Sequence, residues 1–198
     1  VRWEPSLNFL PRRTRFEDGK EARPDQVMAL DAVERVRRST LWAATAFGKT
    51  LTMAGLFRDF PTSPGVILIH RRDPHIQSFD ALGEMLGEPI GSIGGGEWKE
   101  RRITVAMFDT LQREMKDSDG QMKWDSRAVR FLKRQEVMCI DESHVVGSPS
   151  RYHTAMICPA PIRVGMTGSP WKVGEPLRDF RLEAACGPVA FVFTARDI

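Results

Sequence analysis

The sequence predicts an α/β fold with a mostly parallel central sheet and helices on both of its faces. Short apolar runs alternate with amphipathic segments along all 198 residues, and the turns between them are short. The run Val66-Ile67-Leu68-Ile69 is unbroken and β-branched, which is typical of a strand buried on both faces. Alternating strands and helices favour a parallel sheet. We expect one domain at residues 23–198, preceded by an arm at residues 1–22 that is rich in arginine, proline and charge.

The individual elements follow from local patterns along the chain. The first helix begins at Pro24, which suits a first helical turn, and extends to about residue 37 with apolar residues at steps of three and four. Apolar runs predict strands at residues 40–44, 66–69, 103–107, 137–140, 162–166 and 190–193. Helical periodicity predicts further helices at residues 51–60, 73–86, 109–115, 126–134, 150–157 and 178–186. Residues 88–100 contain four glycines and are expected to form a flexible loop.

The composition excludes several classes of protein. The chain is 41% hydrophobic and 28% charged, as in ordinary globular domains, and its net charge of +3 permits a nucleic-acid partner without arguing for one. Three cysteines, at spacings unlike a zinc module, cannot make a disulfide framework. We therefore expect no structural metal and a reducing compartment such as the cytoplasm. No apolar run is long enough to span a membrane, so no membrane partner is expected.

Residues 43–50 read Ala-Ala-Thr-Ala-Phe-Gly-Lys-Thr and lie between a predicted strand and a predicted helix. Backbone N–H groups at such a turn point at phosphates, and the helix dipole favours negative charge there. Gly48 allows close backbone approach, Lys49 can reach the β- and γ-phosphates, and the hydroxyl of Thr50 can hold Mg²⁺. Ala43 stands where the strict pattern has glycine, so a chance strand-to-helix turn remains an alternative at this point.

A carboxylate pair, Asp141 and Glu142, follows the apolar run 137–140. In open parallel sheets ligands bind at the carboxyl ends of the strands, where the loop at residues 43–50 also lies. Asp141 can hold Mg²⁺, and Glu142 can orient an attacking water. Lys49, Asp141 and Glu142 are thus the candidate catalytic residues, and together the two segments predict binding and hydrolysis of a nucleoside triphosphate.

Three segments resemble motifs of superfamily 2 helicases of the DExH type. The loop at residues 43–50 resembles motif I, Asp141-Glu142-Ser143-His144 resembles motif II, and Thr167-Gly168-Ser169-Pro170 resembles motif III. The resemblance implies a RecA-like P-loop NTPase with a three-layer fold, using ATP and Mg²⁺. Alanine at position 43 is common in that group. The resemblance also implies that His144 couples the ATP site to Thr167 and Ser169.

Arg23-Pro24-Asp25-Gln26 resembles the Q-type motif of the same helicases, in which the glutamine reads the adenine edge and favours ATP over GTP. By this match Gln26 makes that contact, although a solvent-facing side chain is the alternative. Ala46 departs from the usual glycine in the loop and puts the loop's flexibility in doubt. The nucleotide-binding residues implied in this way are Arg23, Gln26, Ala46, Phe47, Gly48, Lys49 and Thr50.

The family's nucleic-acid motifs also have counterparts. Residues 69–73, the glycine loop near residue 95 and residues 106–111 resemble them, which implies phosphate contacts by Arg71, Arg72, Gly95 and Thr110. Small groups and backbone amides suit contacts that follow a phosphate chain without reading bases. Surface ion pairs are the alternative for the two arginines.

The resemblance covers residues 23 to about 194, which is one of the two RecA-like lobes of such a motor. Motifs IV to VI, including the arginine finger, belong to the second lobe, so the 198 residues alone are expected to bind ATP weakly and hydrolyse it slowly. The function implied is the ATP-binding lobe of a DNA helicase or translocase acting on duplex or branched DNA, similar to phage and DNA-repair helicases. Alternatives are an RNA helicase, a restriction-system motor subunit, a P-loop kinase or NTPase, and a non-catalytic nucleic-acid-binding module.

Overall fold

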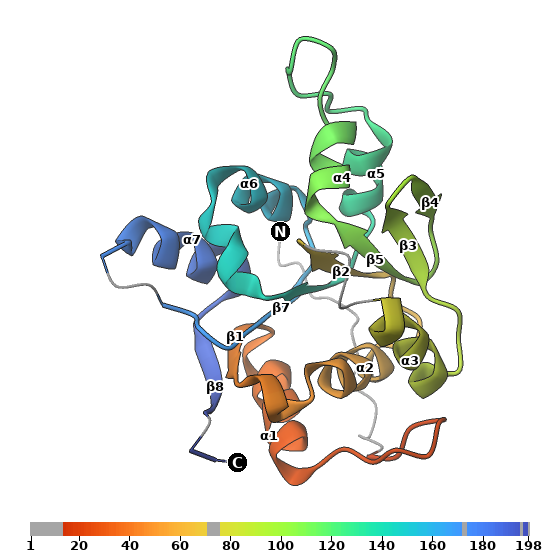
Figure 1. Cartoon of the computed structure of the whole chain (residues 1–198), viewed down its shortest axis with the longest axis vertical. Coiled ribbons are helices and arrows are strands. Elements are labelled where there is room, and N and C mark those ends of the chain that lie inside the picture. Colours follow the sequence, from red (N-terminus) through yellow and green to blue (C-terminus); the bar gives the residue numbers. More distant parts are fainter. Residues whose placement is uncertain (1–13, 71–75, 172–173, 195, 198) are drawn as a thin grey trace, which may run out of the picture.

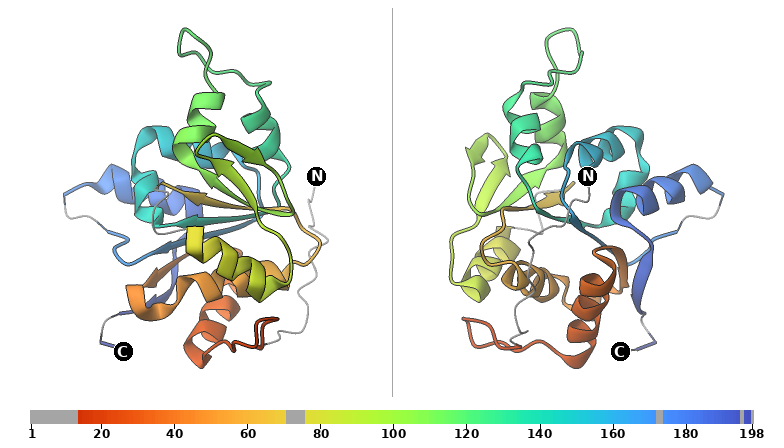
Figure 2. Two further views of the ribbon diagram at one scale, coloured as in Figure 1. Left: turned by 45° about the vertical axis from the view of Figure 1, so that its right-hand side comes forward. Right: turned by 180° about the vertical axis from the view of Figure 1, so that it is seen from behind.

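A single eight-stranded sheet forms the centre of the molecule (Figure 1). The computed structural model describes residues 14–70, 76–171, 174–194 and 196–197. The strand order is β4-β3-β5-β2-β6-β7-β1-β8, and every neighbouring pair is parallel except β3 with β4. Helices α1 to α3 cover one face of this sheet and α4 to α7 cover the other (Figures 1 and 2). The predicted three-layer α/β fold is confirmed.

The bounds of the elements agree with the sequence-based prediction to within a few residues, apart from the segment 88–100. The strands are β1 (Arg38–Ala43), β2 (Gly65–Ile69), β3 (Gly91–Gly94), β4 (Glu97–Lys99), β5 (Ile103–Met107), β6 (Val137–Asp141), β7 (Ile162–Thr167) and β8 (Val189–Phe193). The helices are α1 (Pro24–Val36), α2 (Lys49–Asp59), α3 (Ile76–Leu86), α4 (Phe108–Glu114), α5 (Arg127–Lys133), α6 (Pro149–Ile157) and α7 (Pro176–Cys186), with 3-10 turns η1 (Thr45–Phe47) and η2 (Ser143–Gly147).

Strand β2 shows why the apolar runs are unbroken. Ile67 and Ile69 belong to the hydrophobic core under α1 to α3, whereas Val66 and Leu68 belong to the core under α4 to α7. Successive side chains of a strand point to opposite faces, so a strand in the middle layer of three must be apolar at every position.

The expectation of a flexible loop at residues 88–100 is wrong, because this segment forms the hairpin of β3 and β4. Ile93 pairs with Trp98 and Gly94 with Glu97, which leaves Gly95 and Gly96 as a two-residue turn. Both turn residues have positive φ, +59° and +88°. Tight hairpin turns of the I′ type require positive φ at both central residues, and glycine adopts it without strain. The glycines therefore specify a turn rather than disorder.

The part of the N-terminal arm that the structure describes packs against the domain. Phe16 is buried in the core of the α1–α3 face. The guanidinium of Arg58 on α2 lies 3.9 Å from the centre of the Phe16 ring and donates a hydrogen bond of 2.9 Å to the Arg15 carbonyl. Over the described residues, none of the helices is long and apolar enough to cross a membrane.

Candidate nucleotide-binding site

The loop at residues 43–50 connects β1 to α2 at the carboxyl edge of the sheet. Gly48 precedes α2 with left-handed angles (φ 79°, ψ 51°), and no side chain caps the helix. A Cβ at this position would lie 2.7 Å from Nε2 of Gln26, so both the angles and the close approach require glycine. The first N–H groups of α2 thus remain available to an anion, as a phosphate-binding loop requires.

Helix α1 holds this loop from behind. Gln26 is 2% exposed, and its Nε2 donates to the Phe47 carbonyl at 2.8 Å. Nη2 of Arg23 donates to the same carbonyl at 2.9 Å, and the Arg23 amide donates to Oε1 of Gln26 at 3.0 Å. The Gln26 amide therefore supports the loop, which the sequence analysis did not anticipate. Its contact with an adenine edge stays a prediction.

The Phe47 side chain fixes the loop from the other side. It is fully buried, and its ring centre lies 5.5 Å from that of Phe191 and 5.2 Å from that of Phe193, both on β8. Ala46 beside it is exposed. The loop is thus anchored at Phe47 between α1 and β8, while its neighbouring residues stay accessible.

The carboxylate pair lies opposite the loop. Asp141 ends β6 and is 6% exposed, and Glu142 follows it with left-handed angles (φ 48°, ψ 52°). Such angles are unfavourable for a residue with a side chain and are enriched at functional sites. They place the Glu142 carboxylate against the ammonium of Lys49, with which it forms an ion pair. The fold thus brings together two predicted catalytic residues that are far apart in the sequence.

The three residues predicted to couple the site to motif III form one connected group with Glu142. Nδ1 of His144 lies 3.0 Å from Oγ1 of Thr167 and 3.4 Å from Oε2 of Glu142. The Ser169 amide donates to Oγ1 of Thr167 at 3.2 Å. Nε1 of Trp42 also donates to the Gly168 carbonyl at 3.0 Å, a link to β1 that the sequence did not reveal. The contacts exist, and their coupling role stays a prediction.

A family model described as "Type III restriction enzyme, res subunit" matches residues 19–172, well over half of the chain. The chain belongs to this family. A search of curated proteins by sequence returns no match. The family match also bears out the resemblance to the ATP-binding domain of superfamily 2 helicases.

Solved helicase structures share the fold of this ResIII-family domain. The Sulfolobus solfataricus SWI2/SNF2 ATPase core in complex with dsDNA aligns with a TM-score of 0.66 at 14% identity, over 91% of this chain and 38% of that one. The UvsW helicase of bacteriophage T4 aligns with a TM-score of 0.65 at 17% identity, over 86% of this chain and 60% of that one. The Pyrococcus furiosus Hef helicase domain aligns with a TM-score of 0.62 at 17% identity, over 88% of this chain and 39% of that one. The ResIII-family chain therefore spans less than two thirds of each of these chains.

Glu142 carries a full negative charge at neutral pH. The hydrogen bond from His144, followed by the hydrogen bond and charge of Lys49, lowers the pKa of Glu142 from 4.5 to about 2, although partial burial opposes this shift. A carboxylate in this state accepts hydrogen bonds and attracts cations.

The shifted pKa predicts a pH-dependent contribution to stability. A carboxyl group with a lowered folded-state pKa stabilises the fold above its unfolded pKa, and this contribution disappears as the pH falls through the folded value. We expect the free energy of unfolding of wild type to exceed that of Glu142→Gln at pH 6, with the difference shrinking between pH 4.5 and pH 2. Urea unfolding of both variants measures it, and a difference independent of pH would contradict the ion pair.

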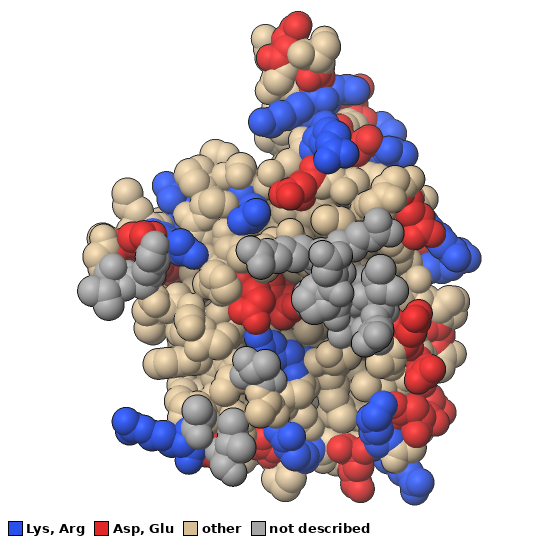
Figure 3. All heavy atoms as spheres, viewed as in Figure 1, with Lys and Arg blue, Asp and Glu red and all other residues tan. Residues whose placement is uncertain are grey.

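The structure describes two of the four residues predicted to contact nucleic acid. Gly95 lies at the tip of the β3–β4 hairpin and Thr110 in the first turn of α4, both beyond the carboxyl ends of strands. Arg71 and Arg72 lie outside the described residues. On the face in Figure 3, basic side chains lie in small groups among acidic ones.

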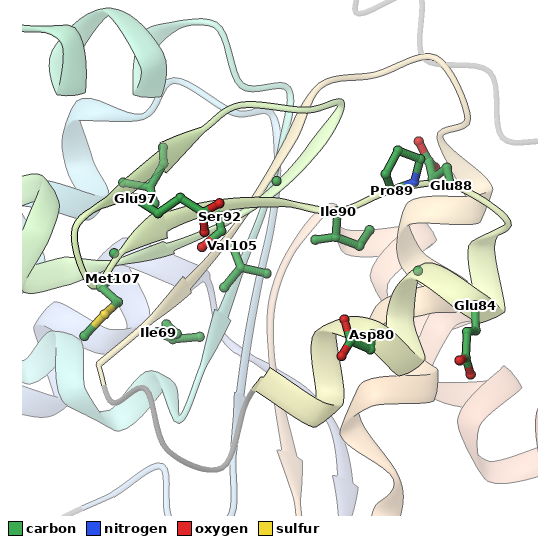
Figure 4. A pocket seen from close by; sticks show the side chains of 14 residues that line it. Ile69, Asp80, Glu84, Glu88, Pro89, Ile90, Ser92, Glu97, Val105 and Met107 are labelled. Carbon is green, nitrogen blue, oxygen red and sulfur yellow. The ribbon is translucent and has the colours of Figure 1, made fainter.

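A hollow of about 690 Å³ lies between α3 and the β3–β4 hairpin, away from the loop (Figure 4). Asp80 and Glu84 line it from the helix, Glu97 lines it from the hairpin, and Glu88 lies between the two elements. Four carboxylates repel phosphate groups, so this hollow is unsuited to nucleotide or nucleic acid. The loop at residues 43–50 and the carboxylate pair therefore stay the predicted nucleotide site.

Proposed function

We propose that the chain is the ATP-binding lobe of a DExH-type DNA helicase or translocase that couples ATP hydrolysis to movement on duplex or branched DNA. The observation that carries this proposal is the juxtaposition of the uncapped α2 helix, Lys49 and the Glu142 carboxylate. A lysine at a helix N-terminus beside an acidic strand end is the arrangement that triphosphate hydrolysis needs. The ResIII family and the helicase fold support the same activity.

The residues present fit a magnesium-bound triphosphate. The hydroxyl of Thr50 and the carboxylate of Asp141 are the hard oxygen ligands that Mg²⁺ prefers, and they come from the two segments that face each other. Gly48 has no Cβ that would displace the Gln26 amide, which supports the loop from behind. Bound at this position, Mg²⁺ would neutralise charge on the phosphate oxygens.

The Lys49–Glu142 ion pair indicates how the site changes on binding. Lys49 exchanges the Glu142 carboxylate for a phosphate oxygen, which leaves an oxygen of Glu142 to accept a hydrogen bond from the attacking water and then its proton. His144 keeps the Glu142 side chain in place during this exchange, because its Nδ1 is already within 3.4 Å.

The second RecA-like lobe of the same polypeptide completes the site in this proposal. An arginine finger raises hydrolysis by about 10³ to 10⁵, so this lobe alone turns over slowly. The buried free thiols of Cys139, Cys158 and Cys186 suit the reducing cytoplasm proposed for it, in a bacterial or phage-infected cell.

DNA is the proposed partner because the SWI2/SNF2 neighbour is a complex with dsDNA and another neighbour is a phage helicase. We expect duplex and branched DNA to stimulate ATP hydrolysis by the intact enzyme more strongly than single-stranded RNA of equal length. Steady-state ATPase assays with each nucleic acid measure this. Stronger stimulation by RNA would replace the proposal with an RNA helicase.

A restriction-system motor subunit is a second candidate, favoured by the description of the matching family. Such a motor acts at defined sites in DNA. If ATP hydrolysis requires a particular recognition sequence in the duplex, this candidate replaces the general translocase, whereas equal stimulation by unrelated duplexes supports the translocase.

A further inference from the structure

A second hollow, of about 860 Å³, opens between α6, α7 and η2. Three arginines line it: Arg151 on α6, and Arg178 and Arg181 on α7. It also touches the residues that follow two neighbouring strands, His70 after β2 and Asp109 after β5. In the described part of the chain no residue of the loop at 43–50 lines it, and His144 is the residue that it shares with the predicted ATPase group.

Two of these arginines are held by backbone carbonyls of η2. Nη2 of Arg178 donates to the His144 carbonyl at 3.2 Å, and Nη1 of Arg181 donates to the Gly147 carbonyl at 2.9 Å. A Cβ at position 147 would lie 1.9 Å from Cγ of Arg178, so this packing requires glycine there. A guanidinium has five N–H donors, and Arg181 uses one of them within the described residues. The positions of both groups are fixed while most donors of Arg181 stay available.

Arg151 makes no hydrogen bond within the described residues. Its nearest acid is Asp109, at 3.9 Å, and that carboxylate is itself 54% exposed, whereas the Arg151 side chain is 29% exposed. This ion pair is long and its acid is largely in solvent, so the guanidinium can donate to a phosphate oxygen as a further partner. Asp109 and Glu175 are the carboxylates in the lining, against three arginines, so the hollow carries a net positive charge.

We propose that this hollow binds a phosphate of the sugar–phosphate backbone of the DNA on which the enzyme moves, which rests on the function proposed above. Planar guanidinium groups bind phosphate oxygens through paired hydrogen bonds, and a hollow with walls of low dielectric constant strengthens the attraction. The hollow lies beside the end of β5, after which the predicted nucleic-acid residue Thr110 follows. A backbone phosphate bound there would lie next to the contact predicted for Thr110.

The site is joined to the ATPase residues through η2. The carbonyl that anchors Arg178 belongs to His144, whose ring lies 3.4 Å from the Glu142 carboxylate. A phosphate that draws Arg178 or Arg181 therefore acts on the turn that positions His144.

Binding of a duplex DNA to the intact enzyme at several salt concentrations tests the site. Arg151→Gln and Arg181→Gln each remove one phosphate contact, and Arg35→Gln, at an exposed position of α1 on the other face of the sheet, is the matched control. Losing one contact reduces the magnitude of the slope of log K against log salt by about 0.9. If the variant and wild type bind equally at 1 M salt, the variant then binds about eightfold more weakly than wild type at 0.1 M salt. We expect this change, equal for unrelated sequences, in both hollow variants and not in Arg35→Gln.

The outcomes separate this site from the proposed function and from other anions. If wild type binds DNA but both hollow variants have the same salt slope as Arg35→Gln, the phosphate site in the hollow is overturned and the proposed function stands. If wild type does not bind DNA, both proposals are overturned. Weakened binding of a fluorescent ATP analogue by Arg151→Gln would assign the hollow to nucleotide instead. Stabilisation of wild type but not Arg151→Gln by inorganic phosphate, with unchanged DNA slopes, would make it a free-phosphate site. Because Arg151 makes no hydrogen bond to any residue that the structure describes, we expect Arg151→Gln to leave the domain folded.

Discussion

Glu142→Gln is expected to lower kcat for ATP hydrolysis in the intact enzyme by about 10²- to 10⁴-fold, the range that a positioned general base contributes. The amide keeps the size of the carboxylate but cannot take a proton from water. The substitution also removes the ion pair between Glu142 and Lys49. ATP binding then does not have to break this ion pair, so the affinity for ATP should be equal to or higher than that of wild type. Steady-state kinetics with saturating DNA, together with ATP titration, measure both quantities.

Glu136→Gln is the matched control for this change. Glu136 is exposed and lies just before β6, at the opposite end of the strand from Glu142. We expect its kcat to equal that of wild type. A Glu142→Gln enzyme that retains kcat within a few-fold of Glu136→Gln would remove Glu142 from the catalytic role.

Lys49→Ala is expected to lower kcat/KM for ATP by at least about 10²- to 10³-fold, the loss typical of removing one electrostatic contact to the reacting group. The α2 helix and Gly48 remain, but the cation that faces both the phosphates and Glu142 is gone. DNA should no longer stimulate hydrolysis. The exposed Lys133 on α5 provides the control variant Lys133→Ala, which should behave as wild type.

If Lys49→Ala and Lys133→Ala hydrolyse ATP at the same rate, the loop at residues 43–50 is not the phosphate site. The ATPase activity that both variants retain would then come from another site in the enzyme.

Much of the site was predictable because its information is local. Gly48, Lys49 and Thr50 occupy a strand-to-helix turn, and Asp141 and Glu142 end an apolar run, so each segment could be identified from its neighbours in sequence. The step from two segments to one site followed from the rule that parallel strands present their carboxyl ends at the same edge. The register of β6 with β7, in which Asp141 is opposite Met166, brings the turn at Thr167 to the same place.

The remaining features depend on tertiary packing that periodicity does not encode. The Gly95-Gly96 pair was interpreted as flexibility, although two apolar neighbours and a two-residue spacing are also a hairpin signal. The support of Phe47 by Gln26 and by the β8 aromatics joins segments distant in the sequence. Likewise, Arg151 and Arg181 meet only because α6 and α7 cover the same side of the sheet.

Isothermal titration of the intact enzyme with magnesium ATP, compared with its Lys49→Ala and Lys133→Ala variants, tests the central claim most directly. The claim is that the loop at residues 43–50 and the Asp141–Glu142 turn form the nucleotide pocket. It predicts saturable binding at one site in wild type and in Lys133→Ala, and loss of that binding in Lys49→Ala. Equal affinity in all three proteins, or no binding by wild type with its second lobe present, would contradict it.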